Sequence, residues 1–356
     1  MANSCRVIVV GGGIVGAAVA WHLARRGARV TVLDAGDLGG TATAASWAWI
    51  NACMADTPDY VRLRVAAMDD WRRLQRAMPQ LQVQWSKALV WDAPAAELEA
   101  RAERFESWGL PVRVVDGVAC RAIEPALLLV PEIALHLPGQ ASVDALQAAT
   151  LLLDAASASG ARVIARTHVR AITTCDARVT GVLTADGVLA ADVVVIAAGS
   201  GSPALLAALD IALPAARDDG AFITVTEPIE PILEGLLVSP DISLRQDIHG
   251  RLIATLDATD VPVGATPEQA GLQAMRHLVH LRSEPLGVRH VSAVRPMPSD
   301  GHPVVGPTRL AGLHVAYTHS GVTLAPLLGR FVSEAILDGL DHPLLFPFRP
   351  ARFATQ

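Results

Sequence analysis

Three glycines near the N-terminus and one acidic residue further on have the spacing of a nucleotide-binding turn. Gly11, Gly13 and Gly16 form a GxGxxG pattern, and Asp34 follows 18 residues after Gly16. In such a turn Gly11 permits a tight bend, Gly13 lets the backbone approach a pyrophosphate, and Gly16 lets the helix pack against the strand. The Asp34 carboxylate can accept hydrogen bonds from ribose hydroxyls. The pattern predicts a dinucleotide site, favours it over a glycine-rich turn without a ligand, and does not separate NAD from FAD.

A single arginine lies in a stiff segment near the C-terminus. Residues 294–303 read VRPMPSDGHP and set Arg295 among three prolines and a glycine. The prolines fix the backbone φ and reduce the entropy lost when the loop is held rigid. A planar guanidinium held in this way can bind a carboxylate through two parallel hydrogen bonds. The alternatives are an exposed surface arginine and an ion pair with Asp300.

The elements around the glycines have the order that such a site needs. The β-branched run 6–10 predicts a parallel strand buried on both faces, and the alanine-rich residues 17–26 predict a helix that Gly27 ends. Residues 29–33 predict a second strand, which leads into the acid. The N-terminus of the first helix would then present free N–H groups and a positive dipole end to the phosphates.

A buried strand at residues 192–200 runs into Gly199 and returns the chain to the nucleotide-binding sheet, whereas residues from Trp85 onward begin a different domain.

Residues 41–46 form a loop of small and hydroxyl-bearing residues before Trp47 and Trp49. This composition suits either a backbone that lies along a flat ring or a loop with two core tryptophans. The other predicted helices are 59–78, 95–108, 144–159 with Asp144 as N-cap, 267–283 and 323–337, and the other predicted strands are 87–91, 112–115, 160–164, 178–184, 186–189, 221–226, 242–246, 252–256 and 313–317.

Composition excludes several classes of protein. A length of 356 residues predicts two domains, and a net charge of −6 argues against a partner that is a nucleic acid. Four widely spaced cysteines offer no metal-ligand cluster and suit a reducing compartment. Residues 7–24 and 193–209 are uncharged, but glycines interrupt both, so we expect neither a transmembrane segment nor a signal peptide and predict a cytoplasmic protein.

Taken together, the GxGxxG turn with its acid, the VVVIAAGS strand and the C-terminal RPxxxDGxPxxG segment with its strand–glycine–helix resemble the FAD-dependent D-amino-acid oxidase superfamily, which includes glycine oxidase and sarcosine oxidase. The resemblance covers nearly the whole chain. It implies an α/β fold in which a Rossmann-type FAD-binding domain (1–80, 141–212 and 292–356) is interleaved with an α+β substrate-binding domain on an antiparallel sheet (81–140 and 213–291).

The resemblance also implies roles for individual residues. The loop 41–46 would run along the isoalloxazine, and the start of the last helix would aim N–H groups at the pyrimidine ring of the flavin, where negative charge develops on reduction. The implied cofactor residues are Gly11, Gly13, Ile14, Val15, Gly16, Asp34, Ala35, Thr41, Thr43, Ala45, Ser46, Val169, Ala198, Gly199, Ser320, Gly321, Val322 and Thr323. Arg295 matches the carboxylate-binding arginine of the family, and His319 lies beside the flavin as a polar contact, as pocket wall or as a structural histidine. The predicted catalytic residues are Arg295 and His319, and the predicted substrate contacts are Trp47, Arg245, Arg295 and His319, although a solvated position is favoured for Arg245.

The chain departs from parts of the family in ways that bear on the cofactor and the substrate. Sarcosine oxidases attach the flavin to a cysteine in the C-terminal half, whereas the last cysteine here is Cys175. Other members use a histidine in the early loop, where this chain has Ser46 and Trp47. We therefore expect noncovalent FAD and no metal. D-amino-acid oxidases rely on tyrosines for the carboxylate, and this chain has only Tyr60 and Tyr317.

The implied reaction oxidises the C–N bond of a small amino acid or N-substituted amino acid of the glycine, sarcosine or D-amino-acid type. Its carboxylate is held, its amine is neutral, and hydride transfer to flavin N5 gives an imine that hydrolyses. O2 or another acceptor takes the electrons, and the oligomeric state, homomeric or heteromeric, is left open. The alternatives are a 2-hydroxy-acid oxidase, for which His319 would be an essential base, and the catalytic subunit of an opine oxidase or dehydrogenase complex. A non-enzymatic nucleotide-binding protein and an NAD-dependent dehydrogenase are less favoured.

Overall fold

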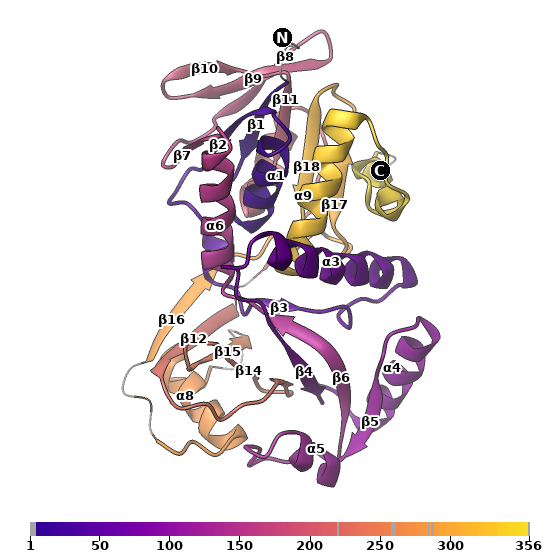
Figure 1. Ribbon diagram of the computed structural model, residues 1–356, viewed down its shortest axis with the longest axis vertical. Coiled ribbons are helices and arrows are strands. Elements are labelled where there is room, and N and C mark those ends of the chain that lie inside the picture. Colours follow the sequence, from indigo (N-terminus) through magenta and orange to yellow (C-terminus); the bar gives the residue numbers. More distant parts are fainter. Residues whose placement is uncertain (1–4, 219–220, 258–260, 284, 286–287, 355–356) are drawn as a thin grey trace.

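The computed structural model describes residues 5–218, 221–257, 261–283, 285 and 288–354. A mainly parallel sheet forms the upper part in Figure 1, with strand order β17-β18-β11-β1-β2-β7. Its parallel strands are β1 (Arg6–Val10), β2 (Arg29–Leu33), β7 (Arg162–Ile164), β11 (Val193–Ile196) and β18 (Leu313–Tyr317), and β17 (Val304–Pro307) runs antiparallel at the edge. The strands are rich in β-branched residues because helices or further strands cover both faces.

Helices that are far apart in the sequence pack together on one face of this sheet. They are α1 (Ile14–Ala24), α6 (Ala145–Ala158) and α9 (Gly321–Asp338), with α1 between the other two, and α3 (Pro58–Ala77) crosses the start of α9 (Figure 1). The crossing of α1 and α9 is close, because a Cβ added at Gly329 would lie 2.7 Å from the carbonyl oxygen of Ala18. The predicted N-cap of α6 is confirmed: Asp144 accepts a hydrogen bond from the backbone N–H of Gln147 at 3.0 Å.

A second, larger sheet lies below the first in Figure 1 and is mostly antiparallel. Its strand order is β16-β12-β15-β14-β13-β4-β6-β3, and β5 pairs with β6. The strands are β3 (Trp49–Ile50), β4 (Gln84–Val90), β5 (Arg113–Asp116), β6 (Ile133–Ser142), β12 (Ala221–Pro228), β13 (Leu236–Val238), β14 (Ser243–Gln246), β15 (Arg251–Asp257) and β16 (Val288–Ala293). The α/β fold with an antiparallel second sheet, as predicted, is thus confirmed.

Smaller elements complete the described chain. A three-stranded antiparallel sheet, β8 (Ala171–Cys175), β9 (Arg178–Thr184) and β10 (Gly187–Ala190), lies at the far end of the molecule from the large sheet (Figure 1). The remaining helices are α2 (Thr41–Ala44), α4 (Ala95–Ser107), α5 (Gly117–Ile123), α7 (Ser202–Ala207) and α8 (Pro267–Leu278), with 3₁₀ turns at Gly199–Gly201, Pro343–Phe348 and Pro350–Phe353. Within the described residues no helix is long and apolar enough to cross a membrane.

The prediction of a helix over 267–283 is wrong at its C-terminal end. Helix α8 stops at Leu278, and Val279 has an extended backbone. The following backbone pairs with a neighbouring segment instead, since His280 N–H donates to the carbonyl oxygen of Ala126 and Leu127 bridges Val279. Tertiary hydrogen bonds therefore end the helix one turn earlier than the sequence pattern indicates.

Candidate active site

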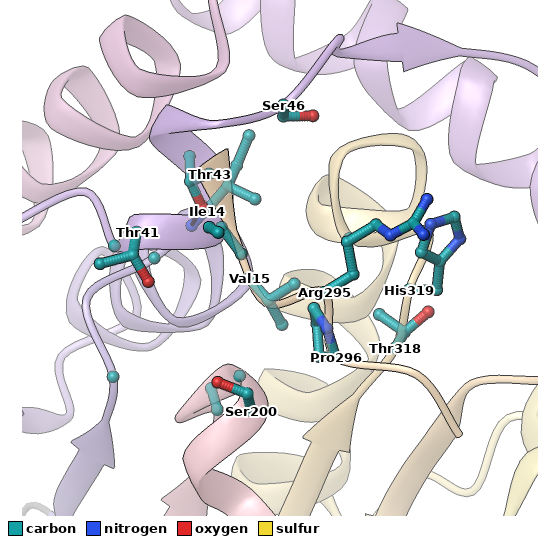
Figure 2. Close-up of a pocket in the computed structure, with 18 of the residues that line it drawn as sticks. Ile14, Val15, Thr41, Thr43, Ser46, Ser200, Arg295, Pro296, Thr318 and His319 are labelled. Atoms are coloured by element: carbon teal, nitrogen blue, oxygen red, sulfur yellow. Dashed lines mark hydrogen bonds between the residues drawn. The ribbon is translucent and has the colours of Figure 1, made fainter. Parts of the chain in front are cut away.

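A cavity of about 860 Å³ is lined by residues of both large sheets and of the loops between them. Its walls include the turn after β1, the end of β2, helix α2, the start of α9 and strands of the antiparallel sheet, and Figure 2 shows part of it. The lining residues include every predicted cofactor residue except Gly16. Segments separated by more than 300 residues in the chain therefore meet at one site.

The glycines of the first turn are required by close backbone contacts. Gly11 has a φ of +107°, and a Cβ there would lie 2.3 Å from the carbonyl oxygen of Ala197. A Cβ on Gly16 would lie 1.9 Å from the carbonyl oxygen of Gly11, which explains why Gly16 closes the turn and does not line the cavity. Gly11 and Gly13 line the cavity, so the turn brings the backbone close to the site of a pyrophosphate.

The carboxylate of Asp34 lies at the end of β2 and on the cavity wall. Its Oδ2 accepts a hydrogen bond from Gly12 N–H at 2.6 Å, and its Oδ1 accepts one from Gly36 N–H at 2.8 Å. Each carboxylate oxygen has a further acceptor site, so this arrangement fixes the orientation of the side chain and leaves it able to accept from ribose hydroxyls.

At the other end of the chain, α9 begins at the cavity with Gly321. Residues 320–323 all line the cavity. The first N–H groups of a helix have no partner within the helix, and its N-terminus carries a partial positive charge. This end of the cavity is therefore suited to a group that carries negative charge.

Arg295 projects toward the cavity beside His319 (Figure 2) and forms an ion pair that the sequence did not indicate. Its Nε and Nη2 donate to Oδ1 of Asp218 at 2.9 and 2.7 Å, and its backbone N–H donates to Oδ2 at 2.6 Å. The alternative of a pair with Asp300 is wrong, because Asp300 binds Arg352. Nη1 of Arg295 makes no hydrogen bond to the described residues, so one edge of the guanidinium, Nη1 with Nη2, remains able to hold a carboxylate.

Tyr317 supports the arginine segment from β18. The Tyr317 side chain is buried, and its hydroxyl interacts with the backbone of Met297, two residues after Arg295. Of the two tyrosines in the chain, this one therefore lies next to the loop that carries the guanidinium.

His319 is a neutral histidine at neutral pH. Burial, together with the nearby positive charges of Arg295 and Arg64, lowers its pKa to about 4, against the opposing effect of Asp218. A neutral imidazole has one donor and one acceptor nitrogen, so it can contact a polar group of a ligand without adding charge. A pKa this low makes it a weak base.

Arg245 has a different place from the predicted one. It does not line the cavity and is not solvated: it is buried, its Nε donates to the carbonyl oxygen of Trp47 at 2.6 Å, and burial lowers its pKa to about 10. Trp47 itself lines the cavity, and its indole N–H donates to the carbonyl oxygen of Ile253. Arg245 therefore positions the loop of Trp47 and does not contact the contents of the cavity.

Sequence reasoning missed residues of α3 and of the loop before it. Arg64, Tyr60 and Asn51 all line the cavity, and Arg64 is 2% exposed. A signal was available, because Arg64 lies four residues after Tyr60 and seven before Trp71, on the buried face of the predicted helix. An arginine in an apolar stripe is unusual and indicates a site or a buried polar network.

The turn with its acid, together with a last helix that returns to the same cavity, defines a dinucleotide-binding protein whose second sheet closes over the site. The chain belongs to the FAD-dependent oxidoreductase family, whose model matches residues 6–335. FAD is thus the cofactor that the family binds, and Gly11 and Gly13 at the cavity wall, the carboxylate of Asp34 and the start of α9 suit such a ligand.

Named relatives are amino-acid oxidases and dehydrogenases. A D-amino acid dehydrogenase of Bradyrhizobium diazoefficiens is 32% identical over 262 residues, which cover 68% of this chain and 61% of that protein. The glycine oxidase of Pseudomonas putida is 30% identical over 377 residues, with 97% of each chain covered. The crystal structure of glycine oxidase from Geobacillus kaustophilus superposes with a TM-score of 0.85 at 25% identity and covers 98% of this chain and 99% of that one. This chain spans about three fifths of the D-amino acid dehydrogenase.

Proposed function

We propose that the protein oxidises the C–N bond of a small amino acid or N-substituted amino acid. The observation that carries the proposal is the free Nη1–Nη2 edge of Arg295 in the cavity that also holds the glycine turn and the start of α9. Asp218 takes the other edge and fixes the guanidinium plane, so the free edge can take a carboxylate in one orientation. Bound FAD supplies the electron-accepting chemistry, and the chain supplies binding and orientation.

The state of His319 favours an amine over an alcohol as the reacting group. A neutral amine loses no O–H proton during its oxidation, whereas a 2-hydroxy acid needs a base to take its hydroxyl proton. His319 is a weak base because burial and the two arginines hold its pKa at about 4. Its ring is suited to orient an amine by a hydrogen bond, with no positive charge that would repel it.

The remaining wall suits a small organic substrate. The antiparallel sheet contributes Ile223, Val238 and Ala293, with the hydroxyls of Ser243 and Thr255. Together with Trp47, these residues give the cavity a mostly apolar part of its wall, which excludes water and accepts an aliphatic side chain. No cysteine lines the cavity in the described residues, which supports noncovalent FAD.

A panel of amines and hydroxy acids tests the proposal. The purified flavoprotein is mixed without oxygen with glycine, sarcosine, D- and L-amino acids, proline analogues, opines and 2-hydroxy acids, and loss of the oxidised flavin absorbance is recorded. We expect reduction by one or more amino or imino acids and none by the hydroxy acid of matched side chain, for example by alanine and not by lactate. Reduction by hydroxy acids alone would replace the proposal with a hydroxy-acid oxidase.

A further inference from the structure

Arg64 is a buried cation without an acidic partner in the part of the chain that the structure describes. The residue is 2% exposed, and it forms no ion pair with a carboxylate of the described residues. Its hydrogen bonds go to neutral oxygens: Nε donates to the carbonyl oxygen of Asn51 at 3.0 Å and Nη2 to its Oδ1 at 2.7 Å. A buried charge is costly unless an opposite charge accompanies it. Because Arg64 lines the cavity, the cavity is where such a charge can come from.

The second part of the network is a pair of hydroxyls at the start of α9. Nη1 of Arg64 donates to the Tyr60 hydroxyl at 3.0 Å and to Oγ of Ser320 at 2.6 Å, and the Tyr60 hydroxyl donates to the same Oγ at 2.9 Å. Ser320 is the residue before the first turn of α9 and lines the cavity.

The direction of the bond between the two hydroxyls decides what the serine offers to the cavity. A guanidinium can only donate, so the two hydroxyls accept from it, and one hydroxyl proton serves the bond between them. With the Tyr60 hydroxyl as the donor in that bond, Oγ of Ser320 accepts from both Arg64 and Tyr60, and its own proton is left over. With both of its lone pairs used, Ser320 is a donor to whatever lies in the cavity.

We propose that Arg64, Tyr60 and Ser320 form a relay that presents a fixed donor and a positive charge to FAD at the start of α9, where they stabilise the negative charge of the reduced cofactor. When FAD takes up two electrons and one proton, the reduced cofactor carries one more negative charge than the oxidised cofactor. The relay adds a full charge to the partial charge of the helix N-terminus, in a site of low dielectric. Arg64 is thus a positioning residue that acts through Ser320. The inference needs bound FAD and does not depend on the proposed amine substrate.

The test is the two-electron reduction potential of the FAD-loaded protein, measured by equilibration with a reference dye. Arg64→Gln removes the charge, Arg64→Lys keeps it, and Ser320→Ala removes the donor. Two variants of α9 are controls, at residues that do not line the cavity: Arg330→Gln, which breaks the ion pair with Asp70 of α3, and Ser333→Ala, whose hydroxyl bonds to a backbone oxygen within α9.

We expect Arg64→Gln to lower the equilibrium constant for reduction at least tenfold, which is about 30 mV for a two-electron couple. Ser320→Ala should lower it about threefold, and Arg64→Lys and both controls should stay within twofold of the unmodified protein. Sulfite, which forms an anionic adduct with oxidised flavin, should bind at least tenfold more weakly to Arg64→Gln. FAD-loaded Arg64→Gln or Ser320→Ala with an unchanged potential would overturn the relay. If Arg64→Gln does not retain FAD, the reduction potential of the milder variant Ser320→Ala decides: an equilibrium constant about threefold lower supports the proposal, and an unchanged potential overturns it.

Discussion

Removing the Arg295 side chain should lower both the free energy of unfolding and kcat/KM, and the two effects can be measured separately. Asp218 is 3% exposed and the Arg295 side chain is 38% exposed, and they share two side-chain hydrogen bonds. Breaking a buried ion pair by removing one partner costs about 3–5 kcal/mol, and the partial exposure of Arg295 reduces this to about 2 kcal/mol. Arg295→Ala should therefore lower the free energy of unfolding by about 2 kcal/mol, because it removes the guanidinium and its two hydrogen bonds from the buried Asp218 carboxylate.

The same variant should lose its hold on the substrate carboxylate. A lost charge-assisted anchor worth about 2 kcal/mol lowers kcat/KM about 30-fold. In the double variant Arg295→Ala/Asp218→Asn the buried negative charge is gone as well, so most of the stability should return while kcat/KM stays low. Urea unfolding monitored by flavin and tryptophan fluorescence measures the first effect, and steady-state kinetics on the substrate found in the panel measures the second.

Two results would refute this reasoning. Equal unfolding free energies for the single variant and the unmodified protein would mean that the ion pair with Asp218 contributes nothing. Recovery of kcat/KM in the double variant would mean that Arg295 acts through the stability of the fold and not as an anchor.

Three further predictions concern pH and the cofactor. Burial lowers the pKa of His22 to about 3 and that of His314 to about 4, so below pH 6.5 the unfolded chain binds more protons than the folded chain. The free energy of unfolding should therefore fall as the pH drops from 6.5 to 4. In pH-dependent urea unfolding His22→Gln should flatten this fall, and a slope identical to that of the unmodified protein would contradict the prediction. Burial raises the pKa of Glu124 to about 7, so the ionised Glu124 lowers the free energy of unfolding as the pH rises, the opposite of the effect of the two histidines. Glu124→Gln should therefore be more stable than the unmodified protein at pH 8, by about 2–3 kcal/mol at most, and should gain no stability at pH 4. Gly13→Val should abolish FAD retention, because a side chain there faces the pyrophosphate path and Thr43 Oγ1 at 3.2 Å; a variant that purifies with the full ratio of flavin to protein absorbance would count against that placement.

The nucleotide-binding half of the fold could be predicted because its signals are local. A buried strand, a glycine turn and a helix follow one another within residues 6–26, and each has its own composition and period. The antiparallel sheet was harder to predict. Strand β6 carries Pro138 and Gly139 in its middle, and its register with β4 shifts between Ser86 and Lys87, so neither strand keeps a clean alternation.

The polar network of the site could be predicted only in part, for a similar reason. Arg295 stands out by the prolines around it, but its partner Asp218 is 77 residues away and no local pattern joins them. Arg64 and Ser320 are 256 residues apart and meet only because α3 crosses the start of α9. The domain boundaries and the roles of the individual cofactor residues stay predictions.

The central claim is that one cavity holds FAD and a carboxylate-bearing amine together, and anaerobic reduction by matched amines tests it most directly. Each amino acid that reduces the flavin is compared with the amine that lacks only its carboxylate, such as alanine with ethylamine or glycine with methylamine. The structure predicts that the amino acid reduces the bound flavin at least 30-fold more efficiently than its partner, and that Arg295→Ala/Asp218→Asn removes most of this preference. Equal reduction by both members of the pair, or a purified protein that binds NAD and carries no flavin, would contradict the account.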